Sequence, residues 1–243
     1  MRMEQEVNDL HTERKTIGVI GAMKAETNAL KAALQDAVTE TVSGVDFVKG
    51  RFGNTELVVA QCGVGKVFAA LCTQTMIQRY QPDCVMNIGV GGSLSEQLNI
   101  ADVGIARAVV QHDLDTTAFG DPPGLVWGIN VVEFPSDPAL VQGLEAAAAS
   151  LGVHTQVGVI ASGDVFVSDA ETKRRLVDTF SAIVCEMEGG AIAHVCYVNQ
   201  VPFCVLRAVS DNGDEHAERN YSNALEMASD VALNVTMAYL KTL

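Results

Sequence analysis

Seven short apolar runs alternate along the chain with segments of helical period. The runs cover residues 17–20, 57–60, 84–88, 103–110, 157–161, 182–185 and 203–206. Several of them are apolar at every position, which is typical of strands covered on both faces of a sheet. The pattern therefore predicts a buried sheet with helices between its strands.

Helix signals occur in the segments between the runs. A helix over residues 66–80 follows a glycine-rich turn, and a second begins with Ser136 as its N-cap. Ser168 and Glu171 have the spacing of a capping box, and a last helix from about Ser222 has apolar residues near a 3.6 period. This β/α alternation predicts one α/β layered domain with a mostly parallel sheet.

The charge balance narrows the classes of partner. The 243 residues include 16 Lys and Arg against 30 Asp and Glu, a formal net charge of −14. Such a chain lacks the basic face that a nucleic acid or an anionic membrane requires, so neither is expected as a partner.

The six Cys show no CxxC spacing, which indicates buried thiols in a reducing compartment. No apolar run approaches the ~20 residues of a membrane span. The first 16 residues are too charged for a signal peptide. We expect a loose tail over 1–16, one domain over 17–243 and a cytoplasmic protein.

Glycines and carboxylates follow six of the runs directly, in residues 21–26, 62–65, 89–92, 162–166, 186–188 and 207–211. Strand ends that share one edge place these segments around a single crevice, the usual ligand site of such sheets. Carboxylates there are costly unless used or paired, so Glu186, Glu188 and Asp211 are candidate functional residues. Glu188 and Asp211 could instead be helix N-cap or first-turn acids that meet a helix dipole. Glu186 and Glu188 face opposite ways if the chain is still extended, so only one then faces the crevice.

Several familiar motifs are incomplete in this sequence. Residues 61–67 lack the first Gly and the Ser/Thr of a P-loop, and residues 18–21 do not form GxGxxG. His112, Asp113 and Asp115 lack the second His/Cys cluster of a metal shell, so no metal is expected and His112 is expected to be hydrogen-bonded in a loop. The absence of a GxSxG elbow disfavours an acyl hydrolase.

Six motifs in a fixed order carry a family resemblance. They are IGVIGAMKAE at 17–26, CGVGK at 62–66, HDLDTTAFG at 112–120, SGDVF at 162–166, EMEGGAIAH at 186–194 and RAVSD at 207–211. From about Ile17 to the C-terminus the sequence resembles the 5′-methylthioadenosine/S-adenosylhomocysteine nucleosidases of the purine nucleoside phosphorylase superfamily. The resemblance implies a three-layer α/β/α single domain with a mixed, largely parallel central sheet. It also implies hydrolysis of the N-glycosidic bond of these two nucleosides, release of adenine, and no cofactor or metal.

The same resemblance implies catalytic roles. Glu26 would be the base for the attacking water, Glu188 would hold the ribose hydroxyls, and Asp211 would protonate purine N7. Ser210 would orient Asp211, and Arg207 would complete the polar network around the water and Glu188. Breaking C1′–N9 builds an oxocarbenium-like sugar and negative charge on the purine, so an acid at N7 and a carboxylate near the ribose suit the reaction. Asp211 should therefore have a raised pKa.

Substrate contacts are also implied by the resemblance. Phe166 would stack on adenine, the backbone of Val167 would bind its edge, and Met187 would pack beneath the ribose. In a homodimer, Phe119 would cover the 5′ substituent in the neighbouring subunit. The remaining expected contacts are Met23, Val64, Gly91, Gly92 and Glu186.

Some positions depart from the family pattern, and other functions stay open. Val90 stands where many members have Ser or Thr, and Gly189–Gly190 replaces bulkier residues, which we expect to allow close approach of a ligand or a subunit. Phosphorolysis is an alternative with Lys24 as the candidate phosphate ligand, although Glu26 beside it and the missing hydroxyl at Val90 disfavour it. A nucleosidase for aminodeoxyfutalosine and a non-catalytic adenine-nucleoside sensor are further alternatives.

Overall fold

The computed structural model describes residues 15–243. Residues 1–14 of the expected tail lie outside the described residues, and Thr16 already opens the first strand. The strands are β1 Thr16–Gly21, β2 Gln35–Val42, β3 Val45–Phe52, β4 Thr55–Gln61, β5 Cys84–Ser93, β6 Val103–Gln111, β7 Phe134–Pro135, β8 Thr155–Ser162, β9 Ala182–Glu186 and β10 Phe203–Asp211. The helices are α1 Lys24–Ala32, α2 Lys66–Tyr80, α3 Pro138–Ser150, α4 Ala170–Phe180, α5 Gly189–Val198 and α6 Ala217–Leu240, with a 3-10 turn η1 at Thr117–Phe119. Each predicted apolar run lies within a strand.

The strands form one mixed sheet in the order β10-β6-β8-β9-β5-β1-β4-β3-β2. A further parallel pairing joins β10 to β5, so β5, β10, β6, β8 and β9 close into a ring from which β1, β4, β3 and β2 extend. β1 pairs in parallel with β4 and β5, whereas β6 runs antiparallel to β10 and β9 antiparallel to β5. The α/β class with a mixed sheet is therefore confirmed.

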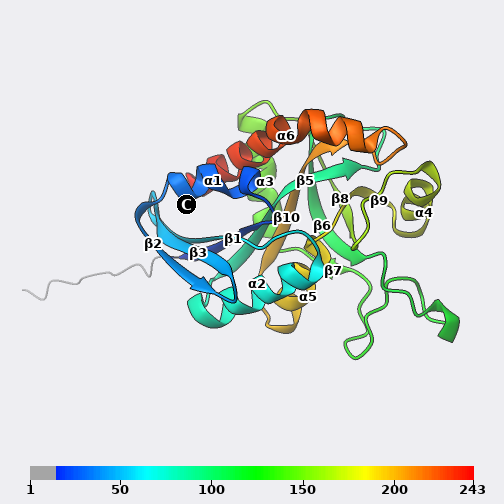
Figure 1. The fold of residues 1–243 in the computed structure, drawn as a ribbon, viewed down its shortest axis with the longest axis horizontal. Coiled ribbons are helices and arrows are strands. Elements are labelled where there is room, and N and C mark those ends of the chain that lie inside the picture. The colour runs from blue at the N-terminus through cyan, green and yellow to red at the C-terminus, as the bar shows by residue number, and fades with distance from the viewer. Residues whose placement is uncertain (1–14) are drawn as a thin grey trace, which may run out of the picture.

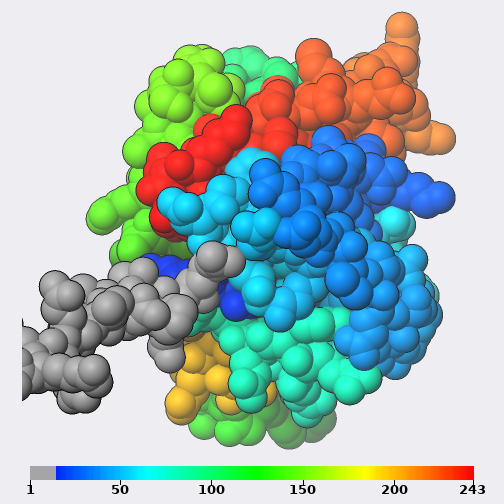
Figure 2. Space-filling view, turned by 90° about the vertical axis from the view of Figure 1, so that its left-hand side faces the viewer, coloured from blue at the N-terminus to red at the C-terminus, as the bar shows by residue number. Residues whose placement is uncertain are grey.

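Helices cover both faces of the sheet (Figure 1). Helices α1, α3 and α6 pack on one face through a core that includes Leu30 and Leu144, and α2 and α5 pack on the other around Met76 and Ile192. Helix α4 lies beside β8 and β9. At the end of the molecule seen in Figure 2, α6 lies along α1. Within residues 15–243, no helix is both long enough and apolar enough to cross a bilayer.

The β2–β3 hairpin and the start of α6 differ from the sequence expectation. Strand β2 is exposed at nearly every position, so it carries no apolar run. The feature that marks the hairpin is the turn between β2 and β3 at Ser43 and Gly44. There φ is 51° and 78°, as a tight hairpin turn requires. Helix α6 begins at Ala217 rather than near Ser222, because its first turn is largely polar and falls outside the apolar period.

Two helices use a different capping residue from the one expected. Helix α3 is capped by Asp137, not Ser136, because the Asp137 carboxylate accepts two first-turn N–H groups at 2.9 and 3.0 Å. Helix α4 is capped by Asp169, which accepts one N–H at 2.7 Å, so the expected box between Ser168 and Glu171 is wrong. In both cases the neighbouring Asp is the stronger acceptor at a helix N-terminus.

Residues 89–92, the glycine-rich segment after the apolar run at 84–88, continue that run as the carboxyl half of β5. An added Cβ on Gly91 would lie 2.7 Å from Val184 and 2.8 Å from the Cys185 carbonyl oxygen, and one on Gly92 would lie 2.7 Å from Asp211 Oδ1. These glycines therefore allow close packing of strands rather than a reversal of the chain. Strand β10 likewise continues to Asp211, with a register shift at its end that brings two successive side chains to the cavity described next.

Candidate active site

A cavity of about 210 Å³ lies at the carboxyl ends of β1, β5, β9 and β10. Of the residues expected from the sequence, it is lined by Met23, Glu26, Val64, Gly91, Gly92, Phe166, Val167, Glu186, Met187, Glu188, Ser210 and Asp211. The other two do not line it: Arg207 is buried among the cavity's carboxylates and Phe119 projects elsewhere. The strand ends thus meet at one crevice, as the sequence indicates.

Glu26 lies in the first turn of α1 and is 3 % exposed. Its Oε2 accepts the N–H groups of Ala22 and Met23 at 2.7 and 2.8 Å, and its Oε1 accepts the Val90 N–H at 3.1 Å. Burial raises the pKa of Glu26, while the positive charge of Arg207 and these N–H groups oppose the rise. The carboxylate is therefore held rigidly, and Oε1 keeps a lone pair free for a further donor.

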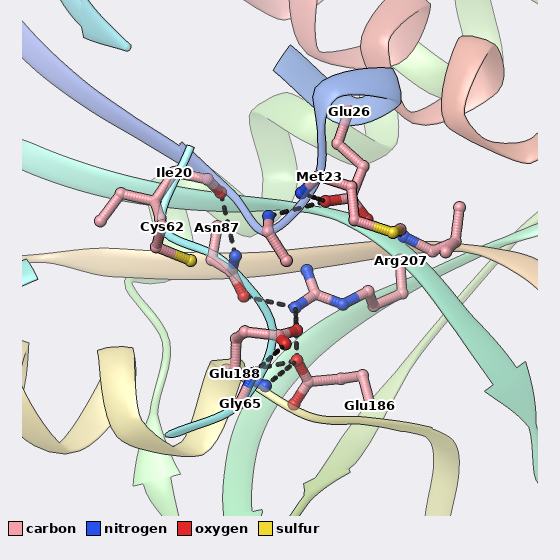
Figure 3. Close-up of polar contacts among 12 residues, drawn as sticks. Ile20, Met23, Glu26, Cys62, Gly65, Asn87, Glu186, Glu188 and Arg207 are labelled. Atoms are coloured by element: carbon pink, nitrogen blue, oxygen red, sulfur yellow. Dashed lines mark hydrogen bonds and ion pairs between the residues drawn. The ribbon is translucent and has the colours of Figure 1, made fainter. Parts of the chain in front are cut away.

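Arg207 is fully buried between Glu26 and the carboxylates of Glu186 and Glu188 (Figure 3). Its Nη2 contacts Glu186 Oε2, lies 3.6 Å from Glu188 Oε2 and donates to Asn87 Oδ1 at 2.6 Å. The same Glu186 Oε2 accepts the N–H groups of Glu188 and Gly189 at 3.0 and 2.7 Å. Glu186 thus fixes the turn into α5 and neutralises Arg207. Because the chain turns after Glu186, the side chains of Glu186 and Glu188 both face the cavity.

Glu188 is the N-cap residue of α5, but its side chain does not cap the helix. Instead Glu188 Oε1 accepts the Gly65 N–H at 2.8 Å. Burial and the charge of Glu186 raise the pKa of Glu188 to about 7, although Arg207 and Gly65 act in the opposite direction. The expected N-cap position of Glu188 is therefore confirmed, but its carboxylate binds the Gly65 N–H instead of capping α5.

Asp211 ends β10, lines the cavity and is 2 % exposed. Ser210 donates its hydroxyl to Asp211 Oδ2 at 2.8 Å, and the Gly213 N–H donates to Oδ1 at 2.9 Å. Burial raises the pKa of Asp211 more than these hydrogen bonds lower it, as expected for an acid at N7. A carboxyl group with a raised pKa in a cleft is suited to proton donation.

An apolar wall faces the carboxylates. It includes Phe166, whose ring meets Tyr221 edge-on at a centroid distance of 5.7 Å. Tyr221 comes from α6, and its hydroxyl lies 3.2 Å from Met23 Sδ. Sequence reasoning missed Tyr221, because the expected start of the last helix excludes it, and it also missed Ala22, Val90, Val165 and Cys185 as lining residues.

Two expectations about individual residues are wrong. His112 is buried, and neither ring nitrogen has a hydrogen-bond partner among residues 15–243, because the ring packs on the Gly163 backbone. Gly190 makes room for strand ends of the same chain rather than for a ligand or a subunit. An added Cβ there would lie 2.8 Å from both Gln111 and Ser162.

Phe119 lies in η1, within the segment between β6 and β7 that projects away from the sheet (Figure 1). Its side chain is 76 % exposed and packs against Trp127 at a centroid distance of 5.5 Å. It does not reach the cavity of its own chain. Across residues 15–243 no three His, Cys, Asp or Glu side chains are grouped as metal ligands.

Comparisons with known proteins agree with this geometry. The family model described as the phosphorylase superfamily matches residues 16–241. The 5′-methylthioadenosine/S-adenosylhomocysteine nucleosidase of Shewanella loihica is 37 % identical over 229 residues, which cover 93 % of this chain and 99 % of that protein. The crystal structure of the corresponding nucleosidase from Neisseria meningitidis, in complex with methylthio-immucillin-A, is 33 % identical with a TM-score of 0.91 and covers 94 % of this chain and 100 % of that one. The futalosine hydrolase of Helicobacter pylori is 36 % identical with a TM-score of 0.90 and covers 94 % and 98 %.

The fold and a match over nearly the whole described chain define a member of the phosphorylase superfamily. Within it, the chain belongs to the 5′-methylthioadenosine/S-adenosylhomocysteine nucleosidase family.

The raised pKa of Glu188 predicts a pH-dependent cost to stability. Because the folded state holds this proton up to about pH 7 and an unfolded Glu releases it near pH 4.3, the folded state binds more protons between these values. The free energy of unfolding should therefore fall as pH rises through this window, by about 3 kcal/mol from this group. Urea unfolding of wild type and Glu188→Gln at pH 5 and pH 8 measures it. The variant should lose less stability than wild type, and equal losses would contradict the prediction.

Proposed function

We propose that this protein hydrolyses the N-glycosidic bond of 5′-methylthioadenosine and S-adenosylhomocysteine, releasing adenine and the 5-thioribose product. The observation that carries the proposal is the presence of two buried carboxyl groups with raised pKa values, Asp211 and Glu26, in one cavity. An acid on one side of a glycosidic bond and a base on the other are the groups that its hydrolysis needs.

Asp211 serves the leaving group in this mechanism. As the C1′–N9 bond breaks, negative charge develops on the purine, and a proton delivered to N7 neutralises it. Ser210 and the Gly213 N–H fix the orientation of the carboxyl. Phe166 and Val167, which line the same part of the cavity wall, would hold the adenine ring against it.

Glu26 and Glu188 serve the sugar side. The free lone pair of Glu26 Oε1 accepts the proton of the attacking water, and the ionised Glu188 accepts hydrogen bonds from the ribose hydroxyls. Arg207, which lies among Glu26, Glu186 and Glu188, favours the charged forms of Glu26 and Glu188. The negative charge near the ribose stabilises the cationic sugar of the transition state.

The charges around the cavity favour hydrolysis over phosphorolysis. The lining residues within the described chain include Glu26, Glu186 and Glu188 and no Lys or Arg. Lys24, the phosphate ligand considered above, is exposed and does not line the cavity. A phosphate dianion would therefore approach three carboxylates without a free cation to bind it.

Adenine release from methylthioadenosine, S-adenosylhomocysteine and adenosine, with and without phosphate, tests the proposal. We expect adenine and free sugar without phosphate. Turnover that requires phosphate and yields a sugar 1-phosphate would instead make this protein a phosphorylase. Binding of the nucleosides without turnover would make it a sensor.

A second substrate is favoured by one comparison. The futalosine hydrolase of Helicobacter pylori resembles this chain as closely as the methylthioadenosine nucleosidases do. Aminodeoxyfutalosine therefore belongs in the same assay, and the ratio of kcat/KM values decides which nucleoside this protein uses.

We also propose that the protein works as a homodimer. Phe119 and Trp127 are exposed together, and Val67, Phe68 and Leu71 form an exposed apolar stripe on α2. Burial of these side chains against a second copy would remove apolar surface from water. Sedimentation should show a wild-type dimer that Phe119→Ala weakens, and adenine-release kinetics should show a higher KM in the variant. A fully active monomer would contradict the proposal.

A further inference from the structure

The N–H group that holds Glu188 belongs to an unusual residue. Gly65 has φ 99° and ψ 162°, a conformation that other residues rarely adopt. It is also the N-cap of α2, and it has no side chain with which to cap that helix. The position of the Gly65 N–H therefore depends on what fixes the start of α2 from outside.

Asp164 supplies the missing cap from another loop. Its Oδ1 accepts the Lys66 N–H, the first of α2, at 2.7 Å. A Cβ added to Gly65 would lie 3.1 Å from the same oxygen, so Asp164 packs directly against the glycine. A carboxylate at this place satisfies a free N–H and meets the positive end of the helix dipole. Asp164 also lies two residues before Phe166, so the contact joins the Glu188 side of the cavity to the aromatic wall.

Asp113 fixes Asp164 in turn. Its Oδ2 accepts the Asp164 N–H at 2.9 Å, and its Oδ1 accepts from Lys66 Nζ at 2.6 Å. The Lys66 and Asp113 side chains are only 18 % and 22 % exposed. Although burial raises the pKa of Asp113, the hydrogen bonds from Lys66 and Asp164 hold it below its usual value. Three loops, at residues 62–66, 111–116 and 162–167, are thus joined by one closed network.

We propose that Lys66, Asp113 and Asp164 are positioning residues that hold the Gly65 N–H on Glu188 and so fix the carboxylate that receives the ribose. We name these three residues the Lys66 clamp. The proposal rests on the proposed function for the role of Glu188, but the clamp itself rests on the hydrogen bonds. None of the three residues lines the cavity, so they act through Gly65 rather than on the substrate.

The clamp has a consequence that a merely structural network lacks. The Gly65 N–H lowers the pKa of Glu188, against burial and Glu186, which raise it. When the clamp is loosened, this hydrogen bond weakens, and Glu188 takes up a proton at higher pH. Ribose binding that depends on the ionised carboxylate should then require a higher pH.

The test measures binding rather than turnover. A 7-deaza analogue of methylthioadenosine presents no N7 to Asp211, so its affinity can be followed from pH 5.5 to 8.5 by calorimetry in wild type, Asp164→Ala and Asp113→Asn. Asp137→Ala is the matched control, because Asp137 is also a carboxylate that caps a helix, as the N-cap residue of α3, and it lies outside the cavity. Glu188→Gln serves as the reference that lacks the titrating group.

We expect both clamp variants to weaken binding of the analogue at pH 7 about tenfold. We also expect them to move the acidic limb of the affinity–pH profile to higher pH by about half to one pH unit. Asp137→Ala should lower Tm and leave the limb in place, and the double variant Asp164→Ala/Asp113→Asn should shift it no further than Asp164→Ala, because the two residues act in series. An unchanged limb in Asp164→Ala, with a loss of Tm like that of Asp137→Ala, would overturn the proposal. This test measures binding and not turnover. A wild-type protein that binds the analogue but releases no adenine from methylthioadenosine would therefore refute the proposed function and leave this test intact.

Discussion

Asp211→Asn should lower kcat for adenine release by about 10²–10⁴-fold, the usual contribution of a general acid. The side chain is almost the same size, so Ser210 and Gly213 can still hold it, but the amide has no proton to transfer to N7. Binding of the 7-deaza nucleoside should change little, because that ligand takes no proton. Single-turnover adenine release and calorimetry measure the two quantities separately.

The pH profile supplies a second measure of the same role. Because the acid must be protonated, wild-type kcat should fall as pH rises through the pKa of Asp211, which burial raises above its ordinary value. That alkaline limb should be absent from the residual activity of Asp211→Asn. Asp137→Asn, at the α3 cap, is the control for loss of an Asp charge. A variant that keeps its rate within about threefold of wild type would remove Asp211 from the acid role.

The sequence was informative where residues are buried on both sides. Strands β1, β5, β9 and β10 contain apolar runs because helices cover both faces, and the polar residues around the cavity follow those runs. The exposed strand β2 has no such run, so local pattern alone could not reveal it.

Long-range packing explains the rest of the differences. Gly91 and Gly92 resemble a turn in sequence, but the strands that approach them fill the space a side chain would need. Tyr221 reaches the cavity only because α6 begins early and passes over Met23. Asp164 resembles an ordinary loop residue, and its role as the cap of α2 depends on a contact between positions 98 residues apart. No spacing rule within one segment can predict such contacts.

The second large effect is expected for Glu26→Gln, which should also lower kcat by about 10²–10⁴-fold. A glutamine cannot accept the proton of the attacking water. In addition, one carboxylate oxygen becomes an NH₂ group, which must face a backbone N–H of Ala22, Met23 or Val90. The unpaired NH₂ donor should lower the free energy of unfolding by about 1–3 kcal/mol. Removal of a buried charge acts in the opposite direction. Glu56→Gln, at a surface ion pair on β4, is the control for loss of a Glu charge.

Gly89→Ala separates the position of this base from its chemistry. A Cβ at Gly89 would lie 2.9 Å from Glu26 Cδ and nearer still to Oε1, so the methyl group must displace the carboxylate without removing it. A displacement of about 1 Å is enough to lower kcat on the order of 10²-fold.

Wild-type kcat should rise with pH through the pKa of Glu26, because the base acts when ionised. That limb should vanish in Glu26→Gln but move to higher pH in Gly89→Ala, since the displaced carboxylate loses backbone hydrogen bonds that lower its pKa. Wild-type rates in both variants would show that the water is activated elsewhere. A loss of rate in Gly89→Ala with the limb unmoved would show that the methyl group acts on the cavity and not on the base.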